Sequence, residues 1–185
     1  MNTVYTFLAD GFEEVEALAV VDLLRRASID VITVSITNIK EVTGAHKITV
    51  ITDTLINDID LSFADLIFLP GGMPGTTNLS ANETLCSSLK NQLENKKRVA
   101  AICAAPSILG ELNLLKGKRA TCYPGFEDKL TGAEYTSEGV VTDGLITTAR
   151  GMGFAIDLGL ELIRILKDSE TSDKIKNGIQ YNFTK

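Results

Sequence analysis

Residues 98–112, RVAAICAAPSILGEL, pass from one kind of secondary structure to another within a few positions. The apolar run 98–103 predicts a buried strand, and the pattern over 105–115 predicts a helix. Pro106 suits the first turn of that helix, where its missing N–H costs little. The stretch therefore indicates a strand of an open α/β sheet that turns sharply into a helix at Cys103.

The same alternation of short apolar runs and longer amphipathic ones continues along the chain. Further strands are predicted over 3–9, 29–36, 64–72 and 119–124, and further helices over 13–27, 82–95 and 153–167. The β-branched stretch 46–56 indicates an antiparallel strand or a hairpin arm, and 139–149 a hairpin around Asp143 and Gly144. The polar tail after 167 is expected to be weakly structured. We expect one domain over 1–185, with a mostly parallel central sheet and helices on both faces.

The bulk composition restricts the class of protein. With 185 residues, 44% hydrophobic residues and a mean hydropathy of +0.13, the chain is long and apolar enough for one buried core. A net charge of −6 argues against nucleic-acid binding, which needs a basic surface. No segment approaches the ~20 apolar residues of a membrane span, and the stretch MNTVYTFLADGFEE lacks the basic region and the cleavage site of a signal peptide. We therefore expect a soluble cytoplasmic protein that binds neither nucleic acid nor membranes.

The cysteines and the single histidine limit the chemistry. Cys86, Cys103 and Cys122 are an odd number without paired spacing, so they form neither a disulfide framework nor a CxxC metal motif. His46 is the one histidine, which excludes a histidine-rich metal site. No metal site is therefore expected.

Three loops are candidates for the functional site, because ligands of open α/β sheets bind at the carboxyl ends of the strands. They follow Ala9, Pro70 and the turn at Cys103. The first loop, LADGFEE, lacks G-x-G-x-x-G, which argues against a dinucleotide. The second, LPGGMPG, lacks the Lys-Ser/Thr of a phosphate-binding loop. Its glycines serve either to turn the chain or to present an N–H to a neighbouring oxyanion.

Two residues of these loops leave alternatives open. Glu16 is the one charged member of an apolar helical stripe, so it is either a boundary residue that reaches solvent or a functional acid with a raised pKa. Cys103 is either a small core residue or a nucleophile on a sharp strand-to-helix turn. In the second case, the following helix N-terminus is expected to lower the thiol pKa.

Several longer motifs carry a resemblance to a known family: GFEEVE (11–16), VDLLRRA (21–27), LPGG (69–72), AAICAAP (100–106) and DGLITTARGMG (143–153). Over nearly its whole length the chain resembles the ThiJ/PfpI superfamily, in the branch of the Parkinson-associated protein deglycase and its bacterial relatives. The resemblance implies a flavodoxin-like sandwich, usually a homodimer in which the first helix and the hairpin region take part in the contact. No cofactor is implied.

The resemblance also implies roles for individual residues. Cys103 corresponds to a nucleophilic cysteine that is readily oxidised to sulfinic acid, and Glu16 to the acid that hydrogen-bonds it. Gly72 and Ala104 correspond to positions whose backbone N–H groups form an oxyanion pocket. The implied activity is a cysteine-dependent glyoxalase or deglycase acting on methylglyoxal or early glycation adducts. The alternatives are a redox sensor or redox-regulated chaperone that uses Cys103, and another small-molecule hydrolase or hydratase on the same fold.

The chain departs from the family pattern at Tyr123, where many relatives carry a histidine close to the cysteine. A Cys–His dyad from that position is therefore excluded, and the proton transfer falls to Glu16 or water. Gly71, Tyr123 and His46 are candidates for lining the pocket. His46 corresponds roughly to an arginine near the partner subunit's site, so it either contributes across a dimer interface or is a surface residue of the hairpin. A peptidase is disfavoured, because relatives with that activity have a histidine where this chain has Ala104.

Overall fold

Seven strands form the central sheet of the structure, a computed structural model that describes residues 2–181. The strands are β1 (Thr3–Leu8), β2 (Asp30–Ser35), β5 (Thr54–Leu55), β6 (Leu66–Leu69), β7 (Arg98–Ile102), β10 (Val140–Asp143) and β11 (Ile146–Ala149). Their order is β10-β11-β7-β6-β1-β2-β5. Neighbours run parallel except β10, which is antiparallel to β11.

The central strands are buried on both faces because their side chains alternate between two separate cores. On β6, Leu66 and Phe68 point into one core, whereas Ile67 and Leu69 point into the other. All four side chains are fully buried. Such continuous apolar runs are typical of parallel strands covered by helices on both sides.

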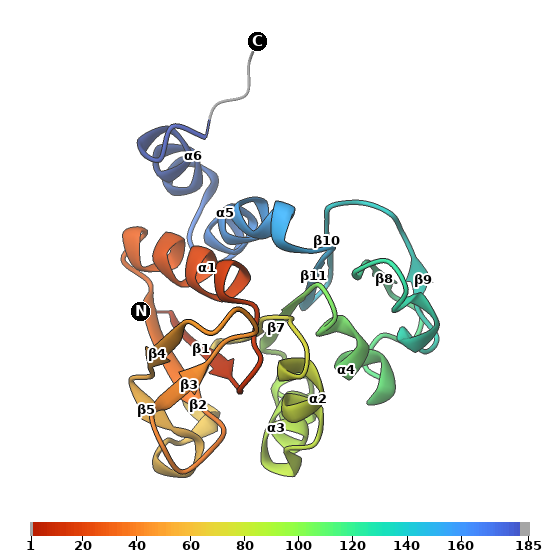
Figure 1. Cartoon of the computed structure of the whole chain (residues 1–185). Coiled ribbons are helices and arrows are strands. Elements are labelled where there is room, and N and C mark those ends of the chain that lie inside the picture. Colours follow the sequence, from red (N-terminus) through yellow and green to blue (C-terminus); the bar gives the residue numbers. More distant parts are fainter. Residues whose placement is uncertain (1, 182–185) are drawn as a thin grey trace.

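Helices cover both faces of the sheet (Figure 1). One layer contains α1 (Glu14–Arg26), α5 (Ala155–Leu166) and α6 (Ser169–Gly178), and the other contains α2 (Gly75–Ser80), α3 (Glu83–Glu94) and α4 (Pro106–Glu111). Helices α1 and α5 pack closely because Gly159 has no side chain: a Cβ there would lie 2.5 Å from Cδ1 of Leu23. The predicted α/β sandwich is thus confirmed.

Smaller elements lie at the ends of the sheet. Strands β3 (Glu41–Thr43) and β4 (Thr49–Ile51) form an antiparallel hairpin, and β8 (Arg119–Ala120) pairs in parallel with β9 (Glu134–Tyr135). Short 3₁₀ turns are η1 (Ile56–Asp58), η2 (Leu61–Phe63), η3 (Glu127–Lys129) and η4 (Met152–Phe154). Within residues 2–181, no helix has both the length and the apolarity needed to cross a membrane.

The expectation of a weakly structured tail is wrong for residues 169–178, which form α6. Asp168 caps this helix by accepting a hydrogen bond from the Thr171 N–H at 2.7 Å. One turn apart, Ile175 and Ile179 pack against the core beneath α5. The cap and the spacing of the isoleucines were both visible in the sequence. The last four residues of the tail, 182–185, lie outside the described part of the chain.

Other predicted ends of strands and helices differ from the observed ones where contacts between distant residues determine the backbone. The strand predicted over 119–124 is limited to β8, because the chain then turns toward Cys103: the Tyr123 N–H donates to the Cys103 carbonyl at 2.8 Å. The helix predicted over 105–115 ends after Glu111, since Asn113 has a left-handed backbone. The stretch 46–56 contains the predicted hairpin arm, β4, and also β5, which instead joins the main sheet.

Candidate active site

Cys103 lies on a sharp turn between β7 and α4. Its φ of +64° is left-handed, a conformation that costs a non-glycine residue ~1–2 kcal/mol. The turn is held by the Cys103 N–H, which donates to the carbonyl of Ala149 on β11 at 2.9 Å. Small residues follow at Ala104 and Ala105, and the thiol remains half-buried rather than enclosed in the core. This backbone corresponds to the strained elbow expected for a nucleophile.

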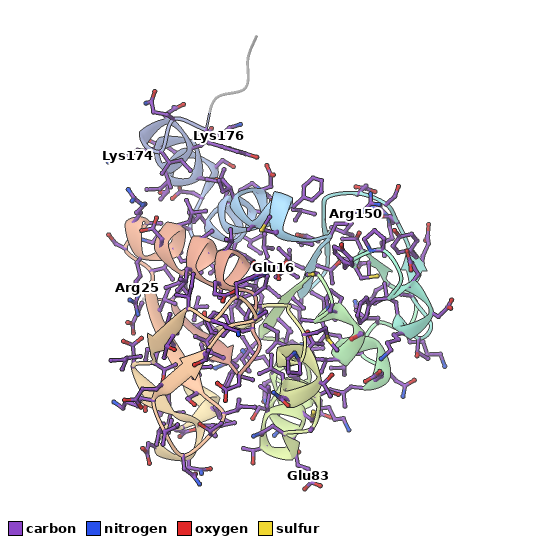
Figure 2. All side chains as sticks on the ribbon, viewed as in Figure 1. Glu16, Arg25, Glu83, Arg150, Lys174 and Lys176 are labelled. Carbon is purple, nitrogen blue, oxygen red and sulfur yellow. The ribbon has the colours of Figure 1, made fainter. Side chains whose placement is uncertain are left out.

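Glu16 lies in the first turn of α1 and is only 1% exposed. Its N–H is held by the carboxylate of Glu13, which caps the helix at 2.7 Å, and its side chain follows the apolar stripe inward. The Glu16 carboxylate accepts a hydrogen bond from the Gly71 N–H at 2.9 Å, and it also bonds the backbone of Met152 and the Cys103 thiol. Figure 2 shows Glu16 in the middle of the molecule, at the inner end of α1. The alternative in which it reaches solvent is therefore wrong.

The two glycines after β6 are required by the closeness of their neighbours. A Cβ at Gly71 would lie 2.6 Å from the Cβ of Cys103 and 2.7 Å from Oε2 of Glu16. Gly72 has a φ of +91°, and a Cβ there would lie 2.4 Å from the backbone nitrogen of Glu13. Glycine is the residue that fits both positions, so this loop can approach the thiol and the acid together.

Two backbone N–H groups, those of Gly72 and Ala104, lie close to the Cys103 sulfur and act to lower the thiol pKa, against the larger effect of burial. They come from different loops, one after β6 and one after β7. Because β6 and β7 are neighbours in the sheet, both loops lie at the same carboxyl edge. Negative charge that develops at the sulfur, or on an oxygen bound next to it, is stabilised by such donors.

Burial raises the pKa of Glu16 to about 7, and the nearby charge of Glu13 acts in the same direction. Burial also raises the pKa of Cys103 to about 12, reinforced by the charge of Glu16 and by its hydrogen bond. The direction at Cys103 is opposite to the lowered thiol pKa expected from the helix N-terminus. The main reason is that burial disfavours the charged thiolate, and the contact with Glu16 adds to this effect.

The two groups are therefore a coupled pair, in which the protonation of one changes the pKa of the other. The repulsion that raises the thiol pKa exists only while Glu16 is ionised. When the proton lies on Glu16, that carboxyl can donate to the sulfur, and the amides of Gly72 and Ala104 stabilise the thiolate. The arrangement can thus supply a nucleophile, an acid and two oxyanion donors at one point.

The structure brings most of the candidate residues together. Glu16, Gly71, Gly72, Cys103 and Ala104 meet at the carboxyl ends of β1, β6 and β7. Tyr123 joins them through its backbone hydrogen bond to Cys103, and its exposed ring lies over Gly151. His46 does not join this group.

His46 instead pairs with a buried glutamate that the sequence analysis did not single out. Glu14 is 3% exposed and accepts hydrogen bonds from the His46 N–H at 2.7 Å and from its Nδ1 at 3.0 Å. Although burial raises the pKa of Glu14, the bonds from His46 and neighbouring amides lower it overall. The hydrogen bond that His46 donates to Glu14 raises the pKa of His46. The carboxylate thus fastens the β3–β4 hairpin to the start of α1.

Glu13, Glu14 and His46 place potential ligand atoms within 4.8 Å of one another. The carboxylates are already engaged, since Glu13 caps α1 and Glu14 accepts backbone hydrogen bonds from the hairpin. The cluster therefore serves as a structural connection between α1 and the β3–β4 hairpin.

Comparisons with known proteins agree with the resemblance carried by the motifs. The model of the DJ-1/PfpI family matches residues 2–165. Protein DJ-1 homolog B of Arabidopsis thaliana is 38% identical over 157 residues, which are 84% of this chain. Parkinson disease protein 7 homolog of Danio rerio is 31% identical over 173 residues, 91% of this chain and 92% of that protein. An oxidized DJ-1 from Toxoplasma gondii superposes with a TM-score of 0.95 at 32% identity, over 99% of this chain and 100% of that chain.

The chain spans less than half the length of the Arabidopsis relatives that it matches, 36% for homolog B and 46% for homolog A. Its length is instead close to that of the Danio rerio relative.

Proposed function

The chain belongs to the DJ-1/PfpI family, and we propose that it is a cysteine-dependent enzyme that detoxifies reactive carbonyl compounds without a cofactor. Its proposed substrates are small 2-oxoaldehydes such as methylglyoxal, and early glycation adducts on proteins. The observation that carries the proposal is the contact of the Cys103 thiol with a buried acid, Glu16, and with two backbone N–H donors.

The proposed reaction begins with the proton of the pair on Glu16. The Cys103 thiolate adds to the aldehyde carbon, and the carbonyl oxygen becomes an oxyanion that the N–H groups of Gly72 and Ala104 stabilise. Glu16 gives its proton to this oxyanion and so becomes a carboxylate. The carboxylate takes the proton from the former aldehyde carbon and returns it to the neighbouring carbon, while the hydroxyl proton passes to the oxygen of that carbon, and the hemithioacetal becomes a thioester. Water hydrolyses the thioester, releases a 2-hydroxy acid and restores the thiol. Methylglyoxal and one water thus give lactate.

The pKa of Glu16 suits this proton transfer. A value of about 7 lets the carboxyl act as an acid and as a base near neutral pH. The reaction therefore does not need a histidine at position 123. This assignment gives Glu16 the role that a Cys–His dyad has in other cysteine enzymes.

Lactate production from methylglyoxal tests the proposal. We expect turnover by the wild type, and its loss in Cys103→Ser and in Glu16→Gln. Cys86→Ser is the matched control, because Cys86 is also half-buried but lies on α3, away from the site. A wild type that makes no lactate contradicts the glyoxalase proposal, and a Cys103→Ser variant that still makes lactate contradicts the site.

A redox role of the same thiol is the second candidate. The N–H donors of Gly72 and Ala104 also suit the oxygens of a sulfinate on Cys103. We expect mild peroxide to oxidise Cys103 before Cys86 and Cys122, as followed by mass spectrometry. Equal oxidation of the three cysteines would count against this role.

We also propose that the chain forms a homodimer. Val15 and Leu18 on α1, and Ile48 and Ile51 at the hairpin, are large apolar side chains that are exposed in one chain. Exposed apolar groups of this kind mark interaction surfaces. Light scattering should give a dimer for the wild type and a monomer for Ile51→Glu. A single domain over 1–185, a cytoplasmic location and the absence of a metal and a cofactor stay predictions.

A further inference from the structure

Three large apolar side chains stand at one side of the Cys103 site and remain exposed. Tyr123 is 51% exposed, Met152 54% and Phe154 38%. The Tyr123 ring lies over Gly151, with Cδ2 3.2 Å from the position of a Cβ on that glycine, and the Phe154 ring lies against Gly139. Gly151 precedes Met152, and its carbonyl accepts a hydrogen bond from the Phe154 N–H at 2.8 Å. We call Tyr123, Met152 and Phe154 the apolar rim.

The apolar rim is connected to both reactive groups through the backbone. The Tyr123 N–H donates to the Cys103 carbonyl at 2.8 Å, and the backbone of Met152 bonds the Glu16 carboxylate. The backbone of Tyr123 and of Met152 is therefore held beside the thiol and the acid.

The chemistry of the rim differs from that of the groups beside it. The thiol, the carboxyl and the two N–H donors bind a polar carbonyl group, whereas the rim offers two aromatic rings and a thioether. Aromatic rings pair with other rings in offset or edge-to-face arrangements, and methionine adapts to flat apolar ligands. Ligand sites commonly combine a few polar groups with such an apolar wall. The single methyl group of methylglyoxal is too small to cover this surface.

We infer that the apolar rim makes the Cys103 site selective for carbonyl compounds that carry an aromatic substituent, such as arylglyoxals. The carbonyl end lies at the thiol and the N–H donors, and the aromatic group lies on Tyr123 and Met152. The inference rests on the proposed function only for the identity of the reactive carbonyl group. The preference for an aromatic group belongs to the rim and does not need turnover.

Alkylation of Cys103 tests the preference for an aromatic group separately from the proposed turnover of carbonyl compounds. Iodoacetamide and iodoacetanilide react in the same way: the thiolate forms a bond to carbon, and iodide leaves with the electron pair of the broken bond. The ratio of their rate constants at Cys103, followed by mass spectrometry, is divided by the same ratio for free N-acetylcysteine. We expect this normalised preference for the anilide to be at least tenfold, which corresponds to about 1.4 kcal/mol.

Substitutions in the apolar rim test whether its side chains cause the preference for the anilide. Tyr123→Ala and Met152→Ala should each reduce it severalfold, whereas Tyr123→Phe should keep it. Tyr135→Ala is the matched control, because Tyr135 is an exposed tyrosine on β9. The kcat/KM ratio of phenylglyoxal to methylglyoxal should follow the same order in the variants.

Several outcomes would overturn the inference. One is a normalised preference near one in the wild type, and another is a preference that Tyr123→Ala and Met152→Ala leave unchanged. A third is a loss of the dimer in these two variants while the preference persists, since the rim would then be a contact between subunits. A preference for the anilide without turnover of any 2-oxoaldehyde supports the rim and contradicts the proposed function instead.

Discussion

Replacing Glu16 by glutamine should change how the stability of the protein depends on pH. Glu16 is 1% exposed, and burial raises its pKa from the ordinary value of 4.5 to about 7. Between these two values the folded state holds the proton of Glu16 while the unfolded state has released it. The stability that this proton contributes is complete below about pH 4.5 and is lost as the pH rises to about 7. Glu16→Gln removes this titration.

The magnitude follows from the two pKa values. The interval from 4.5 to about 7, at about 1.36 kcal/mol for each pKa unit, corresponds to about 3 kcal/mol. Most of this free energy is lost between about pH 5 and pH 8. Over that interval, we expect the difference in unfolding free energy between Glu16→Gln and the wild type to change by about 2.5 kcal/mol. For a chain of 185 residues, 3 kcal/mol corresponds to a shift in Tm of ~6–12 °C.

Urea unfolding of both proteins near pH 5 and near pH 8 measures the effect. As the pH rises, the unfolding free energy of Glu16→Gln should increase relative to that of the wild type. Glu83→Gln is the matched control, because Glu83 is exposed at the start of α3 (Figure 2) and should show the wild-type pH dependence. If the difference between Glu16→Gln and the wild type is the same at both pH values, the reasoning about the buried carboxyl is refuted.

Three other substitutions test contacts around the site and in the core. A Cβ at Gly71 would lie 2.6 Å from the Cβ of Cys103, so Gly71→Ala should slow alkylation of the thiol at least tenfold and destabilise the protein by ~1–3 kcal/mol; an unchanged alkylation rate would contradict the close packing. Glu14 raises the pKa of His46, so Glu14→Gln should lower that pKa in an NMR titration, and an unaltered titration curve would argue against the pair. The Thr6 hydroxyl is buried without a hydrogen bond to the described residues, so Thr6→Val should raise the unfolding free energy by ~1 kcal/mol; a loss of stability in urea would show that the hydroxyl is bonded.

The sequence predicted those residues of the candidate site that stand out in a local pattern. Glu16 was visible as the one charge on an apolar stripe, and Cys103 as a cysteine between a strand and a helix. Neither pattern could decide between a structural and a functional role, because burial depends on what packs against the side chain. The left-handed backbone of Cys103 is also fixed by a distant partner, the carbonyl of Ala149 on β11.

Glu14 is a buried acid whose structural role the local pattern could not indicate. Acidic residues in the first turn of a helix complement the helix dipole, so Glu14 carried no further signal. Its role arises from the hairpin around His46, which lies 32 positions away. Likewise, residues 121–123 have the pattern of a strand, but the contact of Tyr123 with Cys103 draws them out of it.

The sequence by itself determined most strands of the central sheet, the main helices α1, α3, α4 and α5 and the two-sided burial of the sheet, because these depend on periodicity over a few residues. The meeting of Glu16 with Gly71 and Cys103 was decided by the tertiary structure. Glu16 and Gly71 are 55 positions apart, and they come together because β1, β6 and β7 are neighbours whose carboxyl ends share one edge. Only that packing removes water from the carboxyl and brings its pKa to about 7, next to the thiol of Cys103.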